Sequence, residues 1–369
     1  MKFTIQREAL LKPLQLIIGV VERRQTLPVL SNILLKVEKD SIAMTATDLE
    51  IEIVANTPMD VVETGITTIP ARKFLDIVRA LPEEAQIQLS LESDKDRVLI
   101  RSGKSRFHLA LLSADDFPNI EAFNASFEFE LGQGQMKHLI DKTQFAMAQQ
   151  DVRYYLNGLL MEITQGAVKT VATDGHRLAY CNCETDVSPT DKIQVIIPRK
   201  GVIELAKLLE DNDEPAQIRI SSNHLQVIIP GIRFTTKLID GRFPDYDRVI
   251  PKHGDKDVSA ERETLRQALA RTSILSNEKY RGIRIKLSNG LLQSQAHNPE
   301  MEEAEEEVEV KYQGEALEIG FNVNYILDAL AVISTPNVNL IFGDANSSCL
   351  ITPDDDASQC QYVIMPMRL

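Results

Sequence analysis

Apolar residues recur along this chain at two spacings, and segments of the two kinds follow each other in order. Residues 7–21 ("REALLKPLQLIIGVV") and 200–210 ("KGVIELAKLLE") place apolar side chains three or four positions apart, which predicts amphipathic helices. Alternation of apolar and polar residues predicts half-buried strands, and it occurs in "QIQLSLE" (86–92), "KTVATD" (169–174), "QIRIS" (217–221) and "RFTTKLI" (233–239). The pattern therefore predicts a chain that mixes helices and strands.

The same succession of helices and strands repeats at an offset of about 125 residues. The matching positions pair Asn32 with Asn157, Asp48 with Asp174 and Asn298, Pro70 with Pro198, and Phe117-Pro118 with Phe243-Pro244. Self-similarity at a fixed period indicates a repeated structural unit. We therefore predict three domains, at residues 1–127, 128–253 and 254–369. Each has two helices and mostly antiparallel sheets, which makes the fold class α+β.

Composition narrows the class of protein. With 43% hydrophobic and 25% charged residues, the chain has the make-up of an ordinary globular protein rather than a disordered one. The first residues carry charges within their apolar pattern, and no apolar run approaches the ~20 residues that a membrane span needs. We expect no signal peptide, no membrane contact and a cytoplasmic location.

The cysteines give no sign of a metal site. Cys181, Cys183, Cys349 and Cys360 include one Cys-x-Cys, with no second pair and no nearby histidine, and this spacing is not that of a zinc site. We expect reduced structural thiols, no metal and no cofactor.

One stretch raises the question of catalysis. "TVATDGHRLA" (170–179) places Asp174 and His176 close together, and a hydrolase that uses this pair is one hypothesis. However, "MTATDLEIEI" (44–53) carries the same Ala-Thr-Asp without a histidine, so the position does not require catalysis. The chain also lacks a Gly-x-Ser-x-Gly elbow and a Walker loop. We expect a protein that is not an enzyme, in which the Thr-Asp pair belongs to the scaffold.

Charge is unevenly distributed along the chain. The formal net charge of -14 argues against a nucleic-acid partner for the whole surface, because phosphate repels an anion. Five of the six expected helices nevertheless carry Lys or Arg at spacings that share a face. These residues are Arg7, Lys12, Arg23, Arg24, Arg72, Lys73, Arg79, Lys137, Lys142, Arg199, Lys200, Lys207, Arg262, Arg266 and Arg271. Together they indicate one basic surface that faces phosphate.

Domain size suggests how such a surface meets DNA. A domain of about 125 residues is roughly 36 Å across as a sphere. Three spheres in a closed ring leave only a few ångströms at the centre, whereas six leave a hole of roughly 35 Å, enough for duplex DNA. Only a homodimer supplies six domains. A ring therefore requires two copies of this chain.

Two segments of opposite charge are candidate seams for that dimer. "RSGKSRF" carries Arg101, Lys104 and Arg106 and ends in Phe107, while "NPEMEEAEEEVEV" (298–310) holds seven glutamates, including Glu300, Glu303 and Glu306. Paired between chains around Phe107, Ile274 and Leu275, they supply complementary charge around an apolar centre. Each is alternatively a charged, protected sheet edge. We predict a head-to-tail dimer that is closed twice.

Motifs along the whole chain resemble the bacterial beta sliding clamp family, the beta subunit of DNA polymerase III. They run from "MKFTIQREALLKPLQ" through "LPVLSN", "PARKF", "DVRYYLNG", "VATDGHRLA", "SNEKYRG" and "GRFPDY" to "YVIMPMRL". The resemblance implies the DNA clamp fold, with six domains forming a ring as a homodimer around duplex DNA. It further implies that the protein has no catalytic activity of its own and tethers DNA polymerase III and other replication and repair proteins for processive synthesis. A clamp loader is an implied partner.

The resemblance also implies the roles of particular residues. DNA contacts are expected at Arg24, Arg72, Gln150, Tyr154, Tyr155 and Asn322. Arginine engages phosphate regardless of base sequence, and exposed tyrosines stack on bases or sugars. For the tyrosines, packing in the core at the start of a strand is the alternative. A site for short linear peptides of partner proteins is expected at Leu156, Thr173, Gly175, His176, Arg177, Leu178, Pro244, Arg248, Val249, Asn346, Val363, Ile364, Met365, Pro366, Met367, Arg368 and Leu369.

Two features of that expected peptide site follow from residue type. Met and Pro suit a wall that adapts to several peptides, although a frayed tail is the alternative for the last residues. Asn346 stands where the family often has a small apolar residue, which is expected to shift peptide preference. A peptide-binding replication adaptor that never encircles DNA is the alternative to the clamp as a whole.

Overall fold

The computed structural model describes residues 1–21, 27–59, 61–92, 96–118, 123–252, 254–354 and 359–368. Arg23, Arg24 and Leu369 lie outside the described residues. The chain forms two compact units, one of residues 1–134 with 203–238 and the other of residues 135–202 with 239–369. The three predicted domains are not the units of packing, since each unit combines segments that are distant in the sequence. The boundaries at 127/128 and 253/254 stay a prediction.

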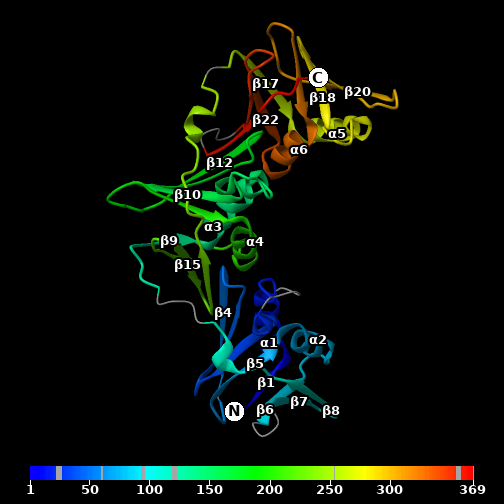
Figure 1. Cartoon of the computed structure of the whole chain (residues 1–369). Helices are drawn as coiled ribbons and strands as arrows, with labels where there is room; N and C mark the ends of the chain where they lie inside the picture. Colours follow the sequence, from blue (N-terminus) through cyan, green and yellow to red (C-terminus); the bar gives the residue numbers. More distant parts are fainter. Residues whose placement is uncertain are drawn as a thin grey trace. The chain divides into compact units, whose positions relative to one another are not determined.

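One order of elements occurs three times in the described chain, as the repeat predicted: strand, helix, four strands, helix, three strands (Figure 1). The first set is β1 (Lys2–Gln6), α1 (Arg7–Ile17), β2 (Asn32–Val37), β3 (Ser41–Thr47), β4 (Ile51–Pro58), β5 (Gly65–Pro70), α2 (Ala71–Ala80), β6 (Gln86–Glu92), β7 (Arg97–Ser102) and β8 (Ser105–Ala110). The second set is β9 (Phe127–Gly132), α3 (Gln133–Thr143), β10 (Gly158–Thr164), β11 (Ala167–Thr173), β12 (Arg177–Glu184), β13 (Ile193–Pro198), α4 (Arg199–Leu208), β14 (Pro215–Ile220), β15 (His224–Ile229) and β16 (Ile232–Lys237). The third set is β17 (Lys256–Glu261), α5 (Arg262–Thr272), β18 (Gly282–Ser288), β19 (Leu291–His297), β20 (Glu303–Glu309), β21 (Leu317–Asn322), α6 (Val323–Val332), β22 (Asn337–Phe342), β23 (Cys349–Pro353) and β24 (Cys360–Ile364).

Each unit contains one four-stranded and one eight-stranded sheet. In the first unit the strand orders are β1-β6-β7-β8 and β5-β2-β3-β4-β16-β15-β14-β9; in the second they are β20-β19-β18-β21 and β13-β10-β11-β12-β24-β23-β22-β17. The pairings between these strands are antiparallel. The predicted α+β class is therefore confirmed. Each eight-stranded sheet joins two of the three sets, through β4–β16 in one unit and β12–β24 in the other.

Helix α1 shows why the helical spacing matters. It buries Leu10, Leu14 and Ile17, which lie three and four positions apart and so share one face, and it packs against β3, β4 and α2. Helix α5 repeats the arrangement: it buries Leu265 and Leu269 and packs against β19, β20 and α6. The helix pattern thus gives each of these helices its one apolar face.

Two arginines of the predicted basic series hold helices together. Arg7 donates hydrogen bonds to the carbonyls of Val78 and Arg79 at the end of α2 (both 3.0 Å). Arg262 does the same in α6, to the carbonyl of Leu330 at 3.3 Å. Free carbonyls at a helix C-terminus carry partial negative charge, so a guanidinium there is stabilising. These two arginines therefore have a structural role within the chain, and their contact with phosphate stays a prediction.

None of the helices in the described part of the chain is long and apolar enough to cross a membrane.

Candidate functional site

The Thr173-Asp174 pair builds a turn between β11 and β12. The Asp174 Oδ1 atom accepts hydrogen bonds from the backbone N–H groups of His176 and Arg177, at 2.9 and 3.1 Å. The Thr173 hydroxyl accepts from the N–H of Gly175 at 3.1 Å and donates to the carbonyl of Arg177 at 2.6 Å. These bonds satisfy backbone groups that the hairpin leaves unpaired.

The first repeat builds the same turn without a histidine. Asp48 Oδ1 accepts from the N–H groups of Glu50 (2.9 Å) and Ile51 (2.7 Å), and Thr47 Oγ1 accepts from that of Leu49 (3.1 Å). The residue after the aspartate has a positive φ in both turns, 77° at Leu49 and 88° at Gly175. Glycine takes this conformation without strain. The repeated Thr-Asp is therefore a scaffold feature, as the sequence predicted.

We expect Asp174→Ala to destabilise the second unit more than Asp48→Ala destabilises the first. Asp48→Ala loses two hydrogen bonds to backbone, which costs about 1–2 kcal/mol in the free energy of unfolding. Asp174→Ala also removes the carboxylate that Arg177 Nε contacts at 3.1 Å. Both effects can be measured by unfolding each variant in denaturant, with hydrogen exchange of the backbone N–H groups in each turn as the local readout. The control is His176→Ala, because the His176 side chain is exposed; if it destabilises as much as Asp174→Ala, the histidine rather than the aspartate holds the turn.

Arg177 is the most heavily engaged residue of this turn. Its side chain is only 11% exposed. It pairs with Asp174 and with Asp328 of α6 at 2.5 Å, and donates to the carbonyl of Phe145 at 2.9 Å. The guanidinium carbon lies 5.3 Å from the ring centroid of Phe145 and 4.6 Å from that of Tyr325, within cation–π range. The arginine thus fixes the hairpin to α6.

The residues Asp328 and Tyr325 were missed by the sequence reasoning. Asp328 is 151 positions from Arg177, and no local pattern marks it. Tyr325 also stacks on His176, with ring centroids 6.5 Å apart and planes at 17°. The contact described for the imidazole of His176 is therefore with an aromatic ring, and a tyrosine ring stacked on its face is not the arrangement of a catalytic base and its nucleophile.

Arg153 supports the turn from the other side. It forms a bidentate pair with Asp151 (3.0 and 2.8 Å) and donates to the carbonyl of Asp174 at 3.2 Å. Hydrogen bonds from the Arg153 side chain and backbone lower the pKa of Asp151 to about 2. A Cβ atom at Gly175 would lie 2.9 Å from the Arg153 guanidinium, so the glycine also leaves room for this contact.

The structure brings four residues of the expected peptide site into one apolar cluster. Leu156, Leu178 and Val363 are buried in it, and Val249 packs against it. The other members include residues that the sequence did not single out: Ala148, Leu160, Val171, Ile196, Phe243, Tyr246 and Leu350, with Tyr155, Tyr180, Ile239, Ile250 and Ile341 at its margin. Segments from the second and third repeats thus form a single buried apolar cluster, with half-buried residues at its margin.

The buried carboxylate of Glu162 binds one tyrosine of the cluster. The Tyr246 hydroxyl donates to Glu162 at 2.9 Å. Burial tends to raise the pKa of Glu162, but hydrogen bonds from Tyr246, Gln194 and Lys192 outweigh it, and the pKa is lowered. Burial also raises the pKa of the neighbouring Tyr180 to about 12. Burial and the charge of Glu162 raise the pKa of Tyr246 as well, so its hydroxyl stays protonated and donates to the ionised carboxylate.

The end of the chain is bound to the hairpin turn. Ile364 of β24 pairs with Arg177, and Val363 pairs with Leu178. Beyond the strand, the Met365 N–H donates to the His176 carbonyl at 2.9 Å, and that of Met367 donates to the Gly320 carbonyl at 2.8 Å. A frayed tail is thus ruled out up to Met367. Met365 and Arg368 are exposed, whereas Pro366 and Met367 are half-buried.

The remaining expected residues lie outside the apolar cluster. Pro244 is exposed in the segment that joins Phe243 to Tyr246. Arg248 is 85% exposed and forms an ion pair with Asp245 at 2.8 Å. Asn346 is exposed in the turn between β22 and β23, where its N–H bonds Asp344 at 2.9 Å. No contact of Asn346 with the cluster is among those described, so its effect on peptide preference stays a prediction.

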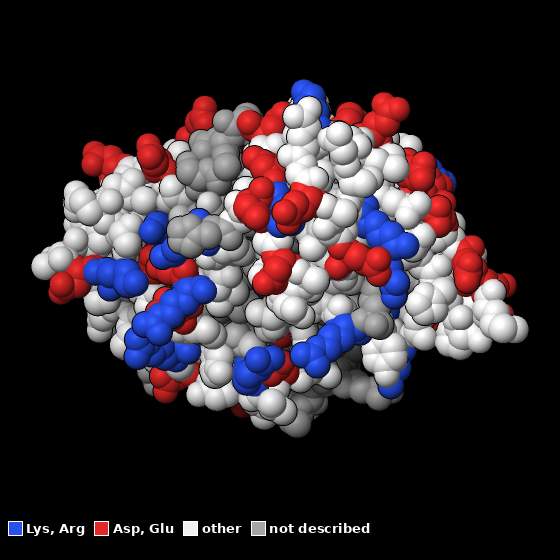
Figure 2. Space-filling view, turned by 90° about the horizontal axis from the view of Figure 1, so that it is seen from above, with Lys and Arg blue, Asp and Glu red and all other residues white. Residues whose placement is uncertain are grey.

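The residues expected to contact DNA have varied surroundings. Arg72 is exposed on α2 and donates to the Val21 carbonyl at 2.7 Å. Tyr154 is 57% exposed and packs edge-on against Tyr155, with ring centroids 5.8 Å apart, and Gln150 is exposed. Asn322 caps α6 by accepting from the N–H of Asn324 at 3.0 Å, which is a structural role of its own. On the face that Figure 2 shows, basic and acidic side chains are intermixed. Arg24 lies outside the described residues.

Several of the expected seam residues lie on or beside strands at one edge of each four-stranded sheet. In the described residues β8 pairs only with β7 and β20 only with β19. Arg106 and Phe107 lie on β8, Glu303 and Glu306 on β20, and Arg101 and Lys104 beside β8. Ile274 is 72% exposed next to Leu275 in the short turn after α5. Glu306 pairs with Arg271 at 2.7 Å, while Glu300 is exposed before β20.

Comparisons with known proteins agree along the whole chain. Models of the DNA polymerase III beta subunit match residues 1–121 with the N-terminal domain, 130–245 with the central domain and 247–368 with the C-terminal domain. The beta sliding clamp of Pseudomonas aeruginosa is 54% identical and that of Escherichia coli K12 is 51% identical, each over all of both chains. The crystal structure of a Pseudomonas aeruginosa sliding clamp bound to griselimycin covers all of both chains, with a TM-score of 0.97 and 54% identity.

The hydrolase hypothesis is wrong. The carboxylate of Asp174 binds backbone N–H groups of its turn and the side chain of Arg177, and the relatives are sliding clamps. The repeats, the composite sheets and the matches over the full length show that the chain belongs to the beta sliding clamp family, the beta subunits of DNA polymerase III, which are non-catalytic processivity factors.

Proposed function

We propose that two copies of this chain close into a ring around duplex DNA and tether DNA polymerase III and other replication and repair proteins to it. The ring contains three domains per chain, at residues 1–127, 128–253 and 254–369, joined head to tail. The site around Arg177 receives short linear peptides of these partners, and a clamp loader opens the ring. The ring acts in the bacterial cytoplasm.

The strand pairing carries the proposal. Within the chain, the third of the four consecutive strands of one set pairs with the last strand of the next set, as β4 pairs with β16 and β12 with β24. The same rule leaves β20 of the third set without a successor and β8 of the first set without a predecessor in the described chain. A second chain supplies both missing partners. In the ring, β20 of each chain pairs with β8 of the other chain. The two seams are therefore identical and related by the symmetry of the dimer.

Charge and apolar exposure support this seam. Unpaired edges invite pairing with another chain, and here one edge is basic and the other is acidic, so the two attract each other while two like edges repel. Ile274 supplies apolar area that is 72% exposed in the single chain. Complementary charge with an apolar centre is the usual make-up of a stable interface.

A peptide of apolar character fits the site around Arg177. The half-buried Val249 packs against the buried cluster that contains Leu178 and Val363. Met365, two residues after Val363, is exposed, and methionine adapts to several side chains. The relative solved with griselimycin supports ligand binding by this family. Of the expected DNA contacts, Arg72 and Tyr154 are exposed, and weak contacts with phosphate let a ring slide.

Retention on circular DNA tests the ring. Labelled protein is assembled on a nicked circular plasmid with a working clamp loader, isolated in moderate salt, and the circle is then cut once. We expect the label to stay on the circle and to leave after the cut, because a closed ring slides off a free end. Label that stays on both forms, or washes off both while a known clamp is retained, contradicts the ring and favours a peptide-binding adaptor that does not encircle DNA.

A further inference from the structure

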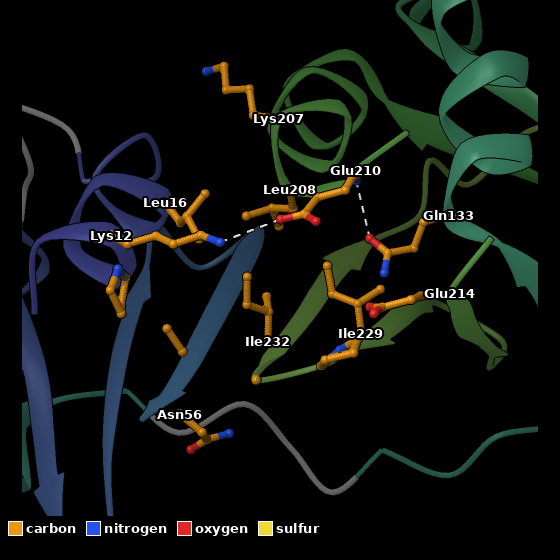
Figure 3. A pocket seen from close by; sticks show the side chains of 14 residues that line it. Lys12, Leu16, Asn56, Gln133, Lys207, Leu208, Glu210, Glu214, Ile229 and Ile232 are labelled. Carbon is orange, nitrogen blue, oxygen red and sulfur yellow. Dashed lines mark hydrogen bonds and ion pairs between the residues drawn. The ribbon is translucent and has the colours of Figure 1, made fainter. Parts of the chain in front are cut away.

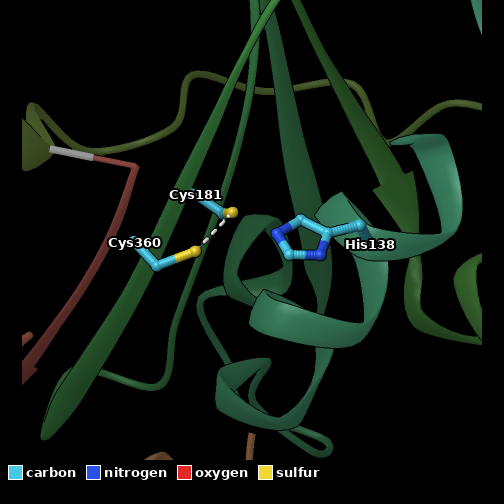
Figure 4. A group of neighbouring side chains, drawn as sticks. All are labelled: His138, Cys181 and Cys360. Atoms are coloured by element: carbon cyan, nitrogen blue, oxygen red, sulfur yellow. Dashed lines mark hydrogen bonds between the residues drawn. The ribbon is translucent and has the colours of Figure 1, made fainter. Parts of the chain in front are cut away.

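Two cysteines and a histidine converge inside the second unit. Cys181 of β12 and Cys360 of β24 face each other in register, with Sγ atoms 2.7 Å apart. His138 of α3 directs its imidazole at them, and the ligand atoms of all three residues lie within 4.8 Å of one another (Figure 4). The two cysteines are 179 residues apart, so their spacing in the sequence concealed the group.

We propose that Cys181, Cys360 and His138 bind a divalent metal ion that prefers sulfur and nitrogen ligands, Zn²⁺ above all. Thiolate and imidazole are the usual ligands of zinc. None of the three donors is a carboxylate, which disfavours Mg²⁺ and Ca²⁺. Three protein ligands leave a fourth position for water. The two sulfur ligands are buried and His138 is exposed, so the ion enters from the side of the histidine.

A buried tyrosine gives a second, independent sign of a ligand. Tyr362 is 1% exposed, and its hydroxyl has no hydrogen-bond partner of ordinary geometry in the described structure. Tyr362 follows Cys360 by two positions on β24, so the two side chains lie on the same face of the sheet. Buried hydroxyls without a partner are rare. A metal-bound thiolate or water is a strong acceptor, and such supporting donors are typical of metal sites.

The first unit shows that the fold does not require these residue types. Helices α1 and α3 are both 11 residues long, and Lys12 and His138 are each sixth in them. In the first unit, Ala55 of β4 pairs with Ile232 of β16, just as Cys181 of β12 pairs with Cys360 of β24 in the second unit. In the first unit, Lys12, Ala55 and Ile232 line a cavity of about 380 Å³ (Figure 3). The thiol pair and the histidine are therefore a feature of the second unit alone.

Cobalt binding tests the proposal on the full-length protein, reduced and stripped of metal with a chelator. We expect Co²⁺ to give one equivalent of thiolate-to-cobalt charge transfer in the ultraviolet and intense visible bands, and Zn²⁺ to abolish both by displacement. Cys181→Ala with Cys360→Ile should lose the bands and bind Zn²⁺ at least about 100-fold more weakly. This double variant carries the residues that the first unit already accommodates, so it is expected to fold. His138→Lys introduces the residue that the first unit has at the corresponding position, Lys12, and it should likewise weaken metal binding.

Two controls separate the site from general metal binding. Cys183→Ala removes a half-exposed thiol outside the group and should leave the cobalt spectrum unchanged, while Tyr362→Phe should weaken Zn²⁺ binding about 10-fold. A wild-type protein without charge transfer, or an equal spectrum in the double variant, overturns the proposal. So does a Cys181–Cys360 disulfide that survives glutathione at cytosolic levels, since it would make the pair a covalent cross-link instead.

Discussion

Ile274→Asp is expected to convert the homodimer into monomers at concentrations where the wild-type protein is fully dimeric. Ile274 is 72% exposed in the single chain, and burial of such a side chain contributes about 1.5–3 kcal/mol. A buried carboxylate without a partner adds a further penalty. Because a ring closed head to tail contains two seams, both losses count twice, and we expect the dimer dissociation constant to rise by at least about 10⁴-fold.

Sedimentation velocity over a range of concentrations measures this change. The matched control is Val62→Asp, which places the same charge at an apolar side chain that is 80% exposed. Val62 adjoins Glu63, which bridges Lys2 of β1, and β1 lies at the opposite edge of its sheet from β8. That variant should remain dimeric. The seam is wrong if Ile274→Asp stays dimeric, or if both variants dissociate alike. Circular dichroism verifies that the monomer is folded.

Deletion of residues 365–369 is expected to abolish peptide binding without affecting the dimer. The tail is held at the site by the bonds from Met365 to His176 and from Met367 to Gly320, and the strand β24 that carries it ends at Ile364. Removal takes away one wall of the site but leaves the β12–β24 pairing. Since a few apolar contacts dominate such interfaces, we expect affinity to fall by about 100-fold or more.

Fluorescence anisotropy measures the loss with a labelled peptide from the polymerase III catalytic subunit, and griselimycin serves as a second probe. Met365→Ala alone should weaken binding about 10-fold. Met301→Ala changes a methionine that is 91% exposed but lies in the turn before β20, so it should bind the peptide as the wild type does. Unchanged binding after the deletion would remove the tail from the site, and monomers after the deletion would show that the tail also supports the seam.

Local structure and its repetition are encoded in short stretches of the sequence. The three-to-four spacing in residues 7–21 predicts α1, and alternation predicts strands such as β6 and β14, because burial of one face is a property of a segment and its period. The scaffold role of Thr47-Asp48 and Thr173-Asp174 is also predictable, since an aspartate side chain bonds N–H groups only two and three residues away. The opposite charges of β8 and β20 are likewise plain from their residues alone.

Which segments meet is settled only in three dimensions. Every half-buried strand alternates in the same way, so no pattern in β4 or β12 names β16 or β24 as its partner. For the same reason the sequence could not link Arg177 to Asp328, or Cys181 to Cys360 and His138. Nor could it show that Arg7 and Arg262 bind the ends of helices, because a charge in the sequence does not reveal a nearby helix C-terminus. Periodicity acts over a few residues, whereas these contacts arise when edges and helix ends that are far apart in the chain come together in space.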